Sequence, residues 1–422
     1  MKIKAVRVTP IAIKDPALLN AAGVHEPFGL RSIIEVEGAN GLIGLGETYG
    51  DAPVLNLLTQ CKDSLVGGSA FDLQRLLRVI QKHNAQAGTA KYIEMELAPG
   101  SKSSSLVCSA YSAFEVAFLD LQARTIGIPL VDLLGGRARD KVAYSAYLFY
   151  KWDASVDPEY APDAYGEAVN PTQIVAQAQR MIDLYGFESI KLKAGVFDPM
   201  EEADAILALQ AAFPGRPLRI DPNSNWSLVT SLKVADILRD SLEYYEDPTP
   251  TLEGMAKLHR ATGMPLATNM VVTNWEELRQ SVALNAVQIV LSDHHYWGGL
   301  RATQALAKTC ESFGLGLSMH SNSHLGISMM AMTHLAASVS HLSYACDTHY
   351  PWQSDEVLLG GKVPIVGGCV HLTDKPGLGV ELDYEHLAKL HEDFKVCRIR
   401  TRNDVMQMQR FKPDWQQVKP RF

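Results

Sequence analysis

A ladder of polar side chains at regular intervals along residues 189–347 constrains this chain more than any other feature. Each short β-like run in that stretch ends in a residue that can hold a cation or carry a proton, and these residues lie 23 to 28 positions apart. One strand, one helix and two short loops take about that length in a barrel of parallel strands. Because the carboxyl ends of parallel strands meet at one rim, we expect the polar side chains to gather there.

The strands and helices of the predicted barrel follow from the same pattern. The first strand is expected at Val142–Tyr150, an irregular mouth segment at Lys151–Asn170, and the last strand at His341–Cys346. The strand-end residues are Lys191 with Lys193, Asp221 with Asn223, Glu246, Asn269, Asp293, His320 and Asp347. Helical patterns lie between the strands at 171–185, 199–213, 226–239, 251–262, 274–284, 300–312 and 324–337. This alternation predicts an α/β fold with a closed parallel sheet.

The rest of the chain predicts a smaller domain, since 422 residues exceed what one compact core supports. Three strand patterns, with an Asn-Gly hairpin between the last two, come first: Lys2–Ile13, Ser32–Glu37 and Leu42–Thr48. Mostly helical patterns follow over residues 51–134, and loop and strand patterns follow Asp347. The predicted units are an N-terminal α+β capping domain at 1–138, the catalytic barrel at 139–370, and a C-terminal segment at 371–422 that packs back on the capping domain.

A long loop is predicted between the first two strands, at Lys14–Leu30. It is rich in glycine, proline and small residues, and it carries His25. Loops of this length in a compact domain are commonly functional. We therefore expect a lid over the barrel site, the alternative being a plain surface connector.

Composition excludes several classes of protein. The formal charge of −8 argues against broad nucleic-acid binding, which needs a basic face. The six cysteines are widely separated and are expected to be reduced thiols of a cytoplasmic protein. Residues 1–15 lack a continuous apolar run, so neither a signal peptide nor a membrane span is expected.

The lysine pair is the first candidate for proton transfer. Lys191 and Lys193 are two positions apart on a strand, so both face the barrel interior. Two ammonium groups this close are expected to depress at least one pKa, which would produce a general base near neutral pH. The alternative is a solvated pair on a sheet edge.

The next three strand ends predict a metal site. Asp221, Glu246 and Asn269 supply oxygen ligands from successive strands, which suits a hard cation such as Mg²⁺ and disfavours zinc. The alternative assigns these residues to turns and loops. The neutral ligand Asn269 leaves more positive charge for the substrate, and we hypothesise that this favours substrates with extra anionic groups. Equal affinity for mono- and dicarboxylates would count against that hypothesis.

Asp293 and His320 follow the next two strands and predict a second acid/base unit. A carboxylate beside an imidazole orients the ring and raises its pKa. This pair lies across the predicted barrel from Lys193, so it would address the opposite face of a substrate. His294 and His295 are expected at the mouth without an assigned role, and His324 is expected to begin a helix.

These residues together resemble the enolase superfamily, specifically its glucarate dehydratase subgroup, over nearly the whole chain. The motifs that carry the resemblance are Lys191-Leu-Lys193, Asp221-Pro-Asn223, Glu246-Asp-Pro248, Ala267-Thr-Asn269-Met270, Ser292-Asp293, Met319-His320-Ser-Asn322, His25-Glu-Pro-Phe28, Thr401-Arg402-Asn-Asp404 and Asp347-Thr-His349. The resemblance implies a modified TIM-type (β/α)7β barrel with an N-terminal capping domain that the C-terminal segment completes. It also implies an Mg²⁺-dependent hydro-lyase that acts on an acid sugar and assembles as a homo-oligomer.

The resemblance further implies individual roles. Lys193 or His320 would remove the proton α to the substrate carboxylate, Lys191 would stabilise the resulting charge, and His320, oriented by Asp293, would protonate the departing β-hydroxyl. Substrate contacts would come from Asn223, Asn322, His25, His349 and Arg402. Three alternatives stay open: a racemase, epimerase or cycloisomerase, a dehydratase of galactarate or an aldonate, and a non-catalytic sugar-acid-binding protein.

Overall fold

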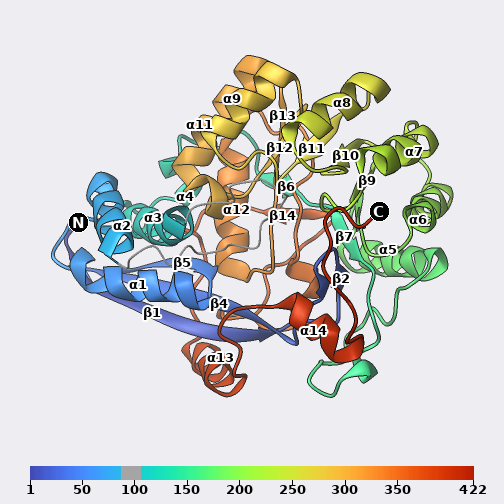
Figure 1. Cartoon of the computed structure of the whole chain (residues 1–422). Coiled ribbons are helices and arrows are strands. Elements are labelled where there is room, and N and C mark those ends of the chain that lie inside the picture. The colour runs from blue at the N-terminus through green and yellow to red at the C-terminus, as the bar shows by residue number, and fades with distance from the viewer. Residues whose placement is uncertain (87–105) are drawn as a thin grey trace.

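The structure is a computed structural model that describes residues 1–86 and 106–422. A sheet with flanking helices, formed by the N-terminal residues, lies beside a larger body in which helices surround a curled parallel sheet (Figure 1). This arrangement confirms the predicted fold class. The boundaries drawn above for the three units stay predictions.

The N-terminal sheet has three antiparallel strands in the order β1-β4-β5. Their bounds are β1 (Ile3–Lys14), β4 (Phe28–Gly38) and β5 (Ile43–Tyr49). Helices α1 (Ala52–Leu65), α2 (Leu73–Gln86) and α3 (Leu106–Ile126) pack beside the sheet, and α4 (Leu130–Leu133) follows. A Cβ atom at Gly44 or Gly46 would lie 2.0 Å or 2.2 Å from a carbonyl oxygen of α3. The two glycines therefore allow α3 to lie directly on β5.

Helix α3 is the central helix of the capping domain. Among the described residues it is the one helix long and apolar enough to cross a membrane, and 78% of its most apolar window is buried inside the protein. Its glutamate and aspartate, Glu115 and Asp120, are buried as well and bond to neighbouring backbone. Such burial is what a core helix of a globular domain requires.

Seven parallel strands form the barrel sheet, in the order β13-β12-β11-β10-β9-β8-β7. Their bounds are β7 (Ala146–Phe149), β8 (Ile190–Lys193), β9 (Leu218–Asp221), β10 (Tyr244–Glu246), β11 (Leu266–Thr268), β12 (Ile289–Ser292) and β13 (Gly316–Met319). The helices between them are α5 (Pro171–Tyr185), α6 (Pro199–Ala212), α7 (Leu228–Leu238), α8 (Leu252–Thr262), α9 (Trp275–Leu284), α11 (Leu300–Phe313) and α12 (Gly326–Ser338). Each predicted βα unit is present, and the single-turn helix α10 (His294–Trp297) is an addition.

The predicted last strand, His341–Cys346, is wrong as a regular strand. The backbone at this place nevertheless bonds on both sides of the gap between β13 and β7. Ser343 and Asp347 donate to Leu317 and Met319 at 3.0 and 2.8 Å, while Cys346 donates to Ala143 at 2.9 Å. The barrel therefore closes through an irregular eighth segment.

The predicted first barrel strand, Val142–Tyr150, is divided in two. Its first part is β6 (Lys141–Ala143), which pairs antiparallel with β14 (Cys369–His371), and only its second part, β7, joins the barrel. The backbone of Tyr144, between the two parts, pairs with Cys346 of the closing segment.

The C-terminal segment contains two helices that the sequence pattern did not predict. Helix α13 (Tyr384–Val396) packs on β1, and α14 (Asp404–Phe411) packs on the short strand β3 (Gly23–Val24). Phe394 of α13 joins Ala12 and Leu30 in one buried cluster. The expectation of loop and strand is therefore wrong here, whereas the expected return to the capping domain is seen.

The predicted loop Lys14–Leu30 is shorter and better packed than expected. Strands β1 and β4 extend into it, and the remaining residues carry the two-residue strands β2 (Leu19–Asn20) and β3. Nearly all of residues 15–27 are buried. The segment is thus part of the packed structure beside the barrel mouth and not an exposed connector.

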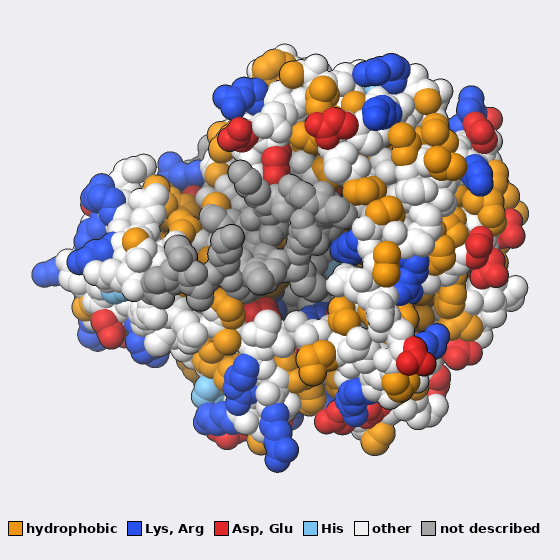
Figure 2. Space-filling model, in the orientation of Figure 1, with side chains coloured by type: hydrophobic (Ala, Val, Ile, Leu, Met, Phe, Trp, Pro, Cys, Tyr) orange, Lys and Arg blue, Asp and Glu red, His pale blue; other side chains and the backbone are white. Residues whose placement is uncertain are grey.

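Over the face of the molecule that Figure 2 shows, acidic and basic side chains are interspersed.

Candidate active site

The strand register brings the predicted site residues to one rim. Lys193 is paired with Asp221 across β8 and β9, and Ser292 with Met319 across β12 and β13. Consequently the residues at the ends of these strands, Asp293 and His320 included, start from the same level of the barrel. All of these side chains are buried.

Lys191 holds the centre of the acidic cluster. Its Nζ donates to Glu246 Oε1 at 2.5 Å and to Asp347 Oδ2 at 2.7 Å, and it lies 3.5 Å from Asp221 Oδ2. Burial alone would lower the pKa of this ammonium, but the charges of Asp347 and Glu246 outweigh it and hold the pKa well above its usual value. The expected repulsion between the two lysines therefore does not govern Lys191, which is a fixed cation.

Lys193 points to the same rim with different partners. Its Nζ donates to Asp221 Oδ2 at 2.6 Å and to Asn223 Oδ1 at 2.9 Å. Burial of Asp221 would raise its pKa, yet the two lysine charges prevail and lower it to about 2. Asn223 itself has a positive φ of 57°, and its backbone N–H donates to Asp221 Oδ1 at 2.9 Å. The lysine, the carboxylate and the amide thus form one bonded group.

The three predicted metal ligands are brought together around these lysines. Asp221 and Glu246 both lie within reach of the same Lys191 ammonium, and Asn269 Nδ2 donates to Glu246 Oε1 at 3.4 Å. Glu246 Oε2 is buried and has no hydrogen-bond partner. Asp247 fixes Asn269 by accepting its backbone N–H at 2.9 Å. A set of buried oxygen donors with an unbonded carboxylate oxygen fits a hard divalent cation.

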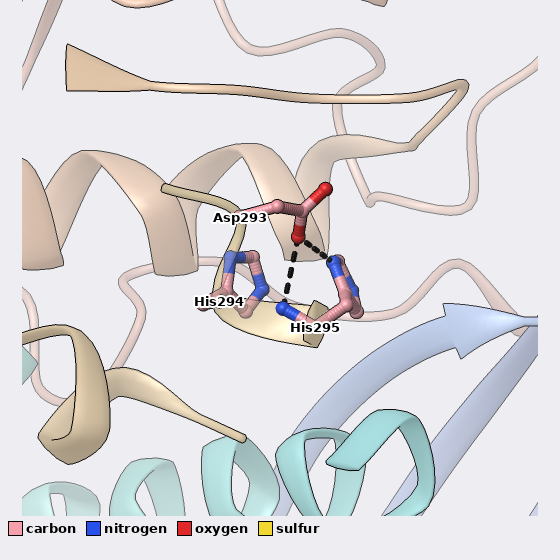
Figure 3. Close-up of side chains that lie close together, drawn as sticks. All are labelled: Asp293, His294 and His295. Carbon is pink, nitrogen blue, oxygen red and sulfur yellow. Dashed lines mark hydrogen bonds and ion pairs between the residues drawn. The ribbon is translucent and has the colours of Figure 1, made fainter. Parts of the chain in front are cut away.

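Asp293 is bonded to two histidines, as Figure 3 shows for one of them. Its Oδ2 lies 3.3 Å from His320 Nδ1, and its Oδ1 accepts from both the backbone N–H of His295, at 2.9 Å, and His295 Nδ1, at 2.8 Å. Burial would raise the pKa of this carboxyl, but the two histidines, His295 above all, hold it well below its usual value. The predicted pairing of Asp293 and His320 is present, with His295 as an unforeseen third member.

The neighbouring histidines complete this side of the site. His294 lies beside His295, with ring centroids 4.0 Å apart, and burial holds its pKa well below the usual value. Its ring, Asp293 and His295 could geometrically hold a metal ion, because one ligand atom from each lies within 4.8 Å of the others. His324 was expected to begin a helix, but it lies just before α12, which starts at Gly326. Its Nε2 lies 3.2 Å from Thr348 Oγ1.

The predicted substrate-binding residues His25, His349 and Arg402 meet on the capping-domain side. The rings of His25 and His349 stack at 6.3 Å, and His349 Nδ1 is buried without a hydrogen-bond partner. Arg402 is bound by two carboxylates, Asp404 at 2.7 and 3.0 Å and Asp15 at 3.0 Å. Its position beside the mouth is therefore fixed by the protein itself.

The predicted contact residue Asn322 is held by two tyrosines. Its Nδ2 donates to Tyr49 Oη at 2.9 Å and to Tyr296 Oη at 2.6 Å. Tyr49 lies at the end of β5, so the capping domain reaches the barrel rim here. Asn322, Tyr49, Asp293 and His320 line one small cavity.

Several residues of this site have no role predicted from the sequence. Asp347 was recognised as the last rung of the ladder, and that signal was sufficient to suggest a partner for a buried lysine. His295 gave no comparable signal, because its contact with the carbonyl of Glu47 joins positions 248 residues apart. Asp15 and Asp404 likewise show their function only once Arg402 is placed between them.

Comparison with known families now identifies the class of protein. Residues 3–135 match the family described as mandelate racemase / muconate lactonizing enzyme, N-terminal domain, and residues 173–387 match the family described as enolase C-terminal domain-like. The chain therefore belongs to the enolase superfamily, as its motifs indicated.

Individual members of the superfamily are similar to this chain over nearly its whole length. A protein of Streptomyces coelicolor called "probable glucarate dehydratase" is 49% identical over 98% of this chain and 97% of its own length. An enolase of Pseudomonas fluorescens, solved with bound magnesium, potassium and tartrate, is 63% identical with a TM-score of 0.97 and covers 100% of this chain and 99% of its own. An enolase of Mycobacterium smegmatis, solved with tartrate, is 49% identical with a TM-score of 0.93 and covers 100% and 98% respectively.

Proposed function

We propose that this enzyme is an Mg²⁺-dependent dehydratase of acid sugars, with an aldaric acid such as glucarate as its substrate. The observation that supports the proposal is that Lys193 and the Asp293–His320 pair flank one cluster of oxygen-bearing side chains. Lys193 on β8 lies on one side of Asp221, Glu246 and Asn269, and the His320–Asp293 pair at β12 and β13 lies on the other. In a barrel of this kind, such groups address opposite faces of a substrate at the rim.

Asp221, Glu246 and Asn269 would hold the magnesium ion. The buried, unbonded Glu246 Oε2 and the absence of any histidine or cysteine among these three residues support that choice. Asn269 would use its Oδ1, the side-chain atom that does not bond Glu246. When bound, the ion stabilises the negative charge that develops on the substrate carboxylate. Magnesium in the Pseudomonas fluorescens relative supports the assignment.

Proton abstraction falls to Lys193 or His320, according to the stereochemistry of the α-carbon. A proton α to a carboxylate is very weakly acidic, so the charge left on the substrate must be stabilised where it forms. The Lys191 ammonium, a permanent cation between Glu246 and Asp347, serves that purpose from the protein side.

His320 then assists departure of the β-hydroxyl. It would donate a proton to that oxygen as the carbon–oxygen bond breaks, so that water leaves and an enol remains, which rearranges to the keto acid. This proton is the abstracted α-proton where His320 is the base, and a proton taken up beforehand from solvent where Lys193 is the base. Asp293 Oδ2, 3.3 Å from His320 Nδ1, keeps the other ring nitrogen facing the substrate. Overall the substrate loses one water and gains a keto-deoxy centre.

Contacts to substrate hydroxyls and to the distal carboxylate would come from Asn223, Asn322, His25, His349 and Arg402. The unpartnered Nδ1 of His349 is a buried polar atom that a substrate hydroxyl can satisfy. Arg402 keeps N–H groups beyond those that Asp15 and Asp404 accept. Tartrate, a dicarboxylate, in two solved relatives supports recognition of a diacid.

A screen of mono- and diacid sugars for keto-acid formation, with Mg²⁺ or with a chelator, tests the proposal. We expect turnover of an aldaric acid that needs Mg²⁺ and is lost in the Glu246→Gln variant. Epimerisation without keto-acid formation would support the racemase alternative, since bases on both faces also allow it. Binding of sugar acids with no chemistry would contradict both readings.

A further inference from the structure

The carboxylate of Asp293 makes its shorter contacts with a histidine other than the proposed base. His295 approaches Asp293 Oδ1 with its backbone N–H and with Nδ1, at 2.9 and 2.8 Å, whereas His320 Nδ1 lies 3.3 Å from Oδ2. Both residues are buried. A buried carboxylate is stabilised most by its nearest hydrogen-bonded partner, which here is His295.

Both ring nitrogens of His295 face acceptors. Nδ1 faces the Asp293 carboxylate, and Nε2 lies 3.2 Å from the main-chain oxygen of Glu47. The Ser328 hydroxyl, which can donate or accept, is farther from Nε2, at 3.4 Å. A carbonyl oxygen can only accept, so an N–H on both nitrogens satisfies this geometry. That is the imidazolium form of histidine.

The charges around His295 leave it as the counter-ion of Asp293. Arg31 donates to Glu47 Oε1 at 2.8 Å, so this pair neutralises itself, and Glu47 accepts two further backbone N–H groups. Burial holds the pKa of His294 well below its usual value and lowers that of His324 to about 3, so both rings are neutral. Among the residues that the structure describes, the titratable and charged groups around His295 include Arg31 of β4, Glu47 and Tyr49 of β5, Asp293, His294 and Tyr296 beside it, His320 after β13 and His324 before α12. Helix α3, which carries Glu115, packs on α10.

We propose that His295 is a positioning residue that serves as the fixed cation of Asp293 and so completes a His295–Asp293–His320 relay. The proposal rests on the proposed role of His320 in proton transfer. A buried carboxylate with no other cation would draw a proton onto His320. With His295 as the cation bonded to Asp293, His320 remains available to accept the α-proton of the substrate.

The same contacts argue against a metal in the Asp293, His294 and His295 cluster. A metal ion would need a lone pair on one ring nitrogen of His295, and both nitrogens face acceptors, Asp293 Oδ1 at 2.8 Å and the Glu47 carbonyl oxygen at 3.2 Å. Arg31 lines the same cavity and adds a positive charge. The cluster is therefore better explained as a hydrogen-bonded relay.

Exchange of the substrate α-proton in deuterium oxide, measured against pH on the face served by His320, tests the relay. In His295→Gln, which can still donate to Asp293 but carries no charge, we expect the acid limb of the profile to move up by roughly one pH unit. Exchange on the Lys193 face should keep its wild-type profile. His295→Lys restores a cation and should move the limb back. His371→Gln, at an exposed position of β14, is the control and should leave the limb in place.

The proposal is overturned if the acid limb of the exchange profile stays in place in a folded His295→Gln enzyme. It is also overturned if the exchange rate falls equally on both faces of the substrate without a pH shift. NMR of the imidazole ¹⁵N nuclei in the full-length wild-type protein supplies a test independent of turnover. Two protonated nitrogens on His295 at neutral pH support the relay, and a neutral ring contradicts it. If no acid sugar undergoes exchange in the wild type, the proposed function fails while the NMR result still decides the state of His295.

Discussion

Replacing Lys191 by methionine removes an ammonium that three buried carboxylates share. Its Nζ lies 2.5 Å from Glu246, 2.7 Å from Asp347 and 3.5 Å from Asp221, and all three carboxylates are buried. Removing one partner of a buried ion pair costs about 3–5 kcal/mol, because a charge is left uncompensated. We therefore expect Lys191→Met to lower the free energy of unfolding by about that amount in the absence of metal.

Urea denaturation in the presence of a chelator measures this loss, with tryptophan fluorescence and circular dichroism as two probes of one transition. Protonation of the carboxylates relieves their repulsion, so the loss should be smaller at pH 5 than at pH 8. Added Mg²⁺ should also reduce the loss, because the variant site is more negative and binds the cation more tightly. Lys257→Met, at an exposed position of α8, should change stability by less than about 0.5 kcal/mol. Equal unfolding midpoints for wild type and Lys191→Met in chelator would refute this view of the cluster.

Two further predictions concern the capping domain. Burial raises the pKa of Glu115 to about 7 although it accepts backbone N–H groups from α11; its protonated form is therefore favoured on folding. We expect wild-type stability relative to Glu115→Gln to be greatest below about pH 4.5 and to fall as the pH rises to about 7, and a flat difference across denaturation curves in that range would contradict this. Gly46→Ala would place a methyl group 2.2 Å from the Ala113 carbonyl oxygen, so calorimetry should show that the free energy of unfolding falls by about 1–3 kcal/mol. An unchanged melting temperature would instead show that α3 can move away from β5.

The parts of the fold that the sequence revealed are those encoded by local patterns. The predicted helix at 171–185 matches the bounds of α5, because Asn170 caps it with its side chain and Gly186 ends it in the left-handed conformation. The strand-end ladder was equally visible, since parallel βα units repeat at nearly constant length. These signals need no knowledge of which segments meet in space.

The missed elements depend on packing or on a pattern that was overlooked. Helix α13 has a signal in its buried Leu387, Leu390 and Phe394 and in the capping side chain of Asp383, but the glycine-rich stretch before it led to an expectation of loop. The eighth barrel segment shows the reverse case. His341–Cys346 has the composition of a strand, but it bonds irregularly to its neighbours where the barrel closes.

The site electrostatics were the least predictable part. Repulsion within the lysine pair was inferred from two residues on one strand, whereas the structure surrounds Lys191 with carboxylates from β9, β10 and the closing segment. His295 bonds both Asp293 and the Glu47 carbonyl of the capping domain. Neither environment can be inferred from sequence spacing, because each is built by segments far apart in the chain.

Stereospecific exchange of the α-proton in deuterium oxide, in the Lys193→Ala and His320→Asn variants with Mg²⁺ present, tests the central claim most directly. If the two groups flank one substrate at the rim, each variant should lose exchange from one face and retain it from the other. Full exchange from both faces in both variants would contradict the account.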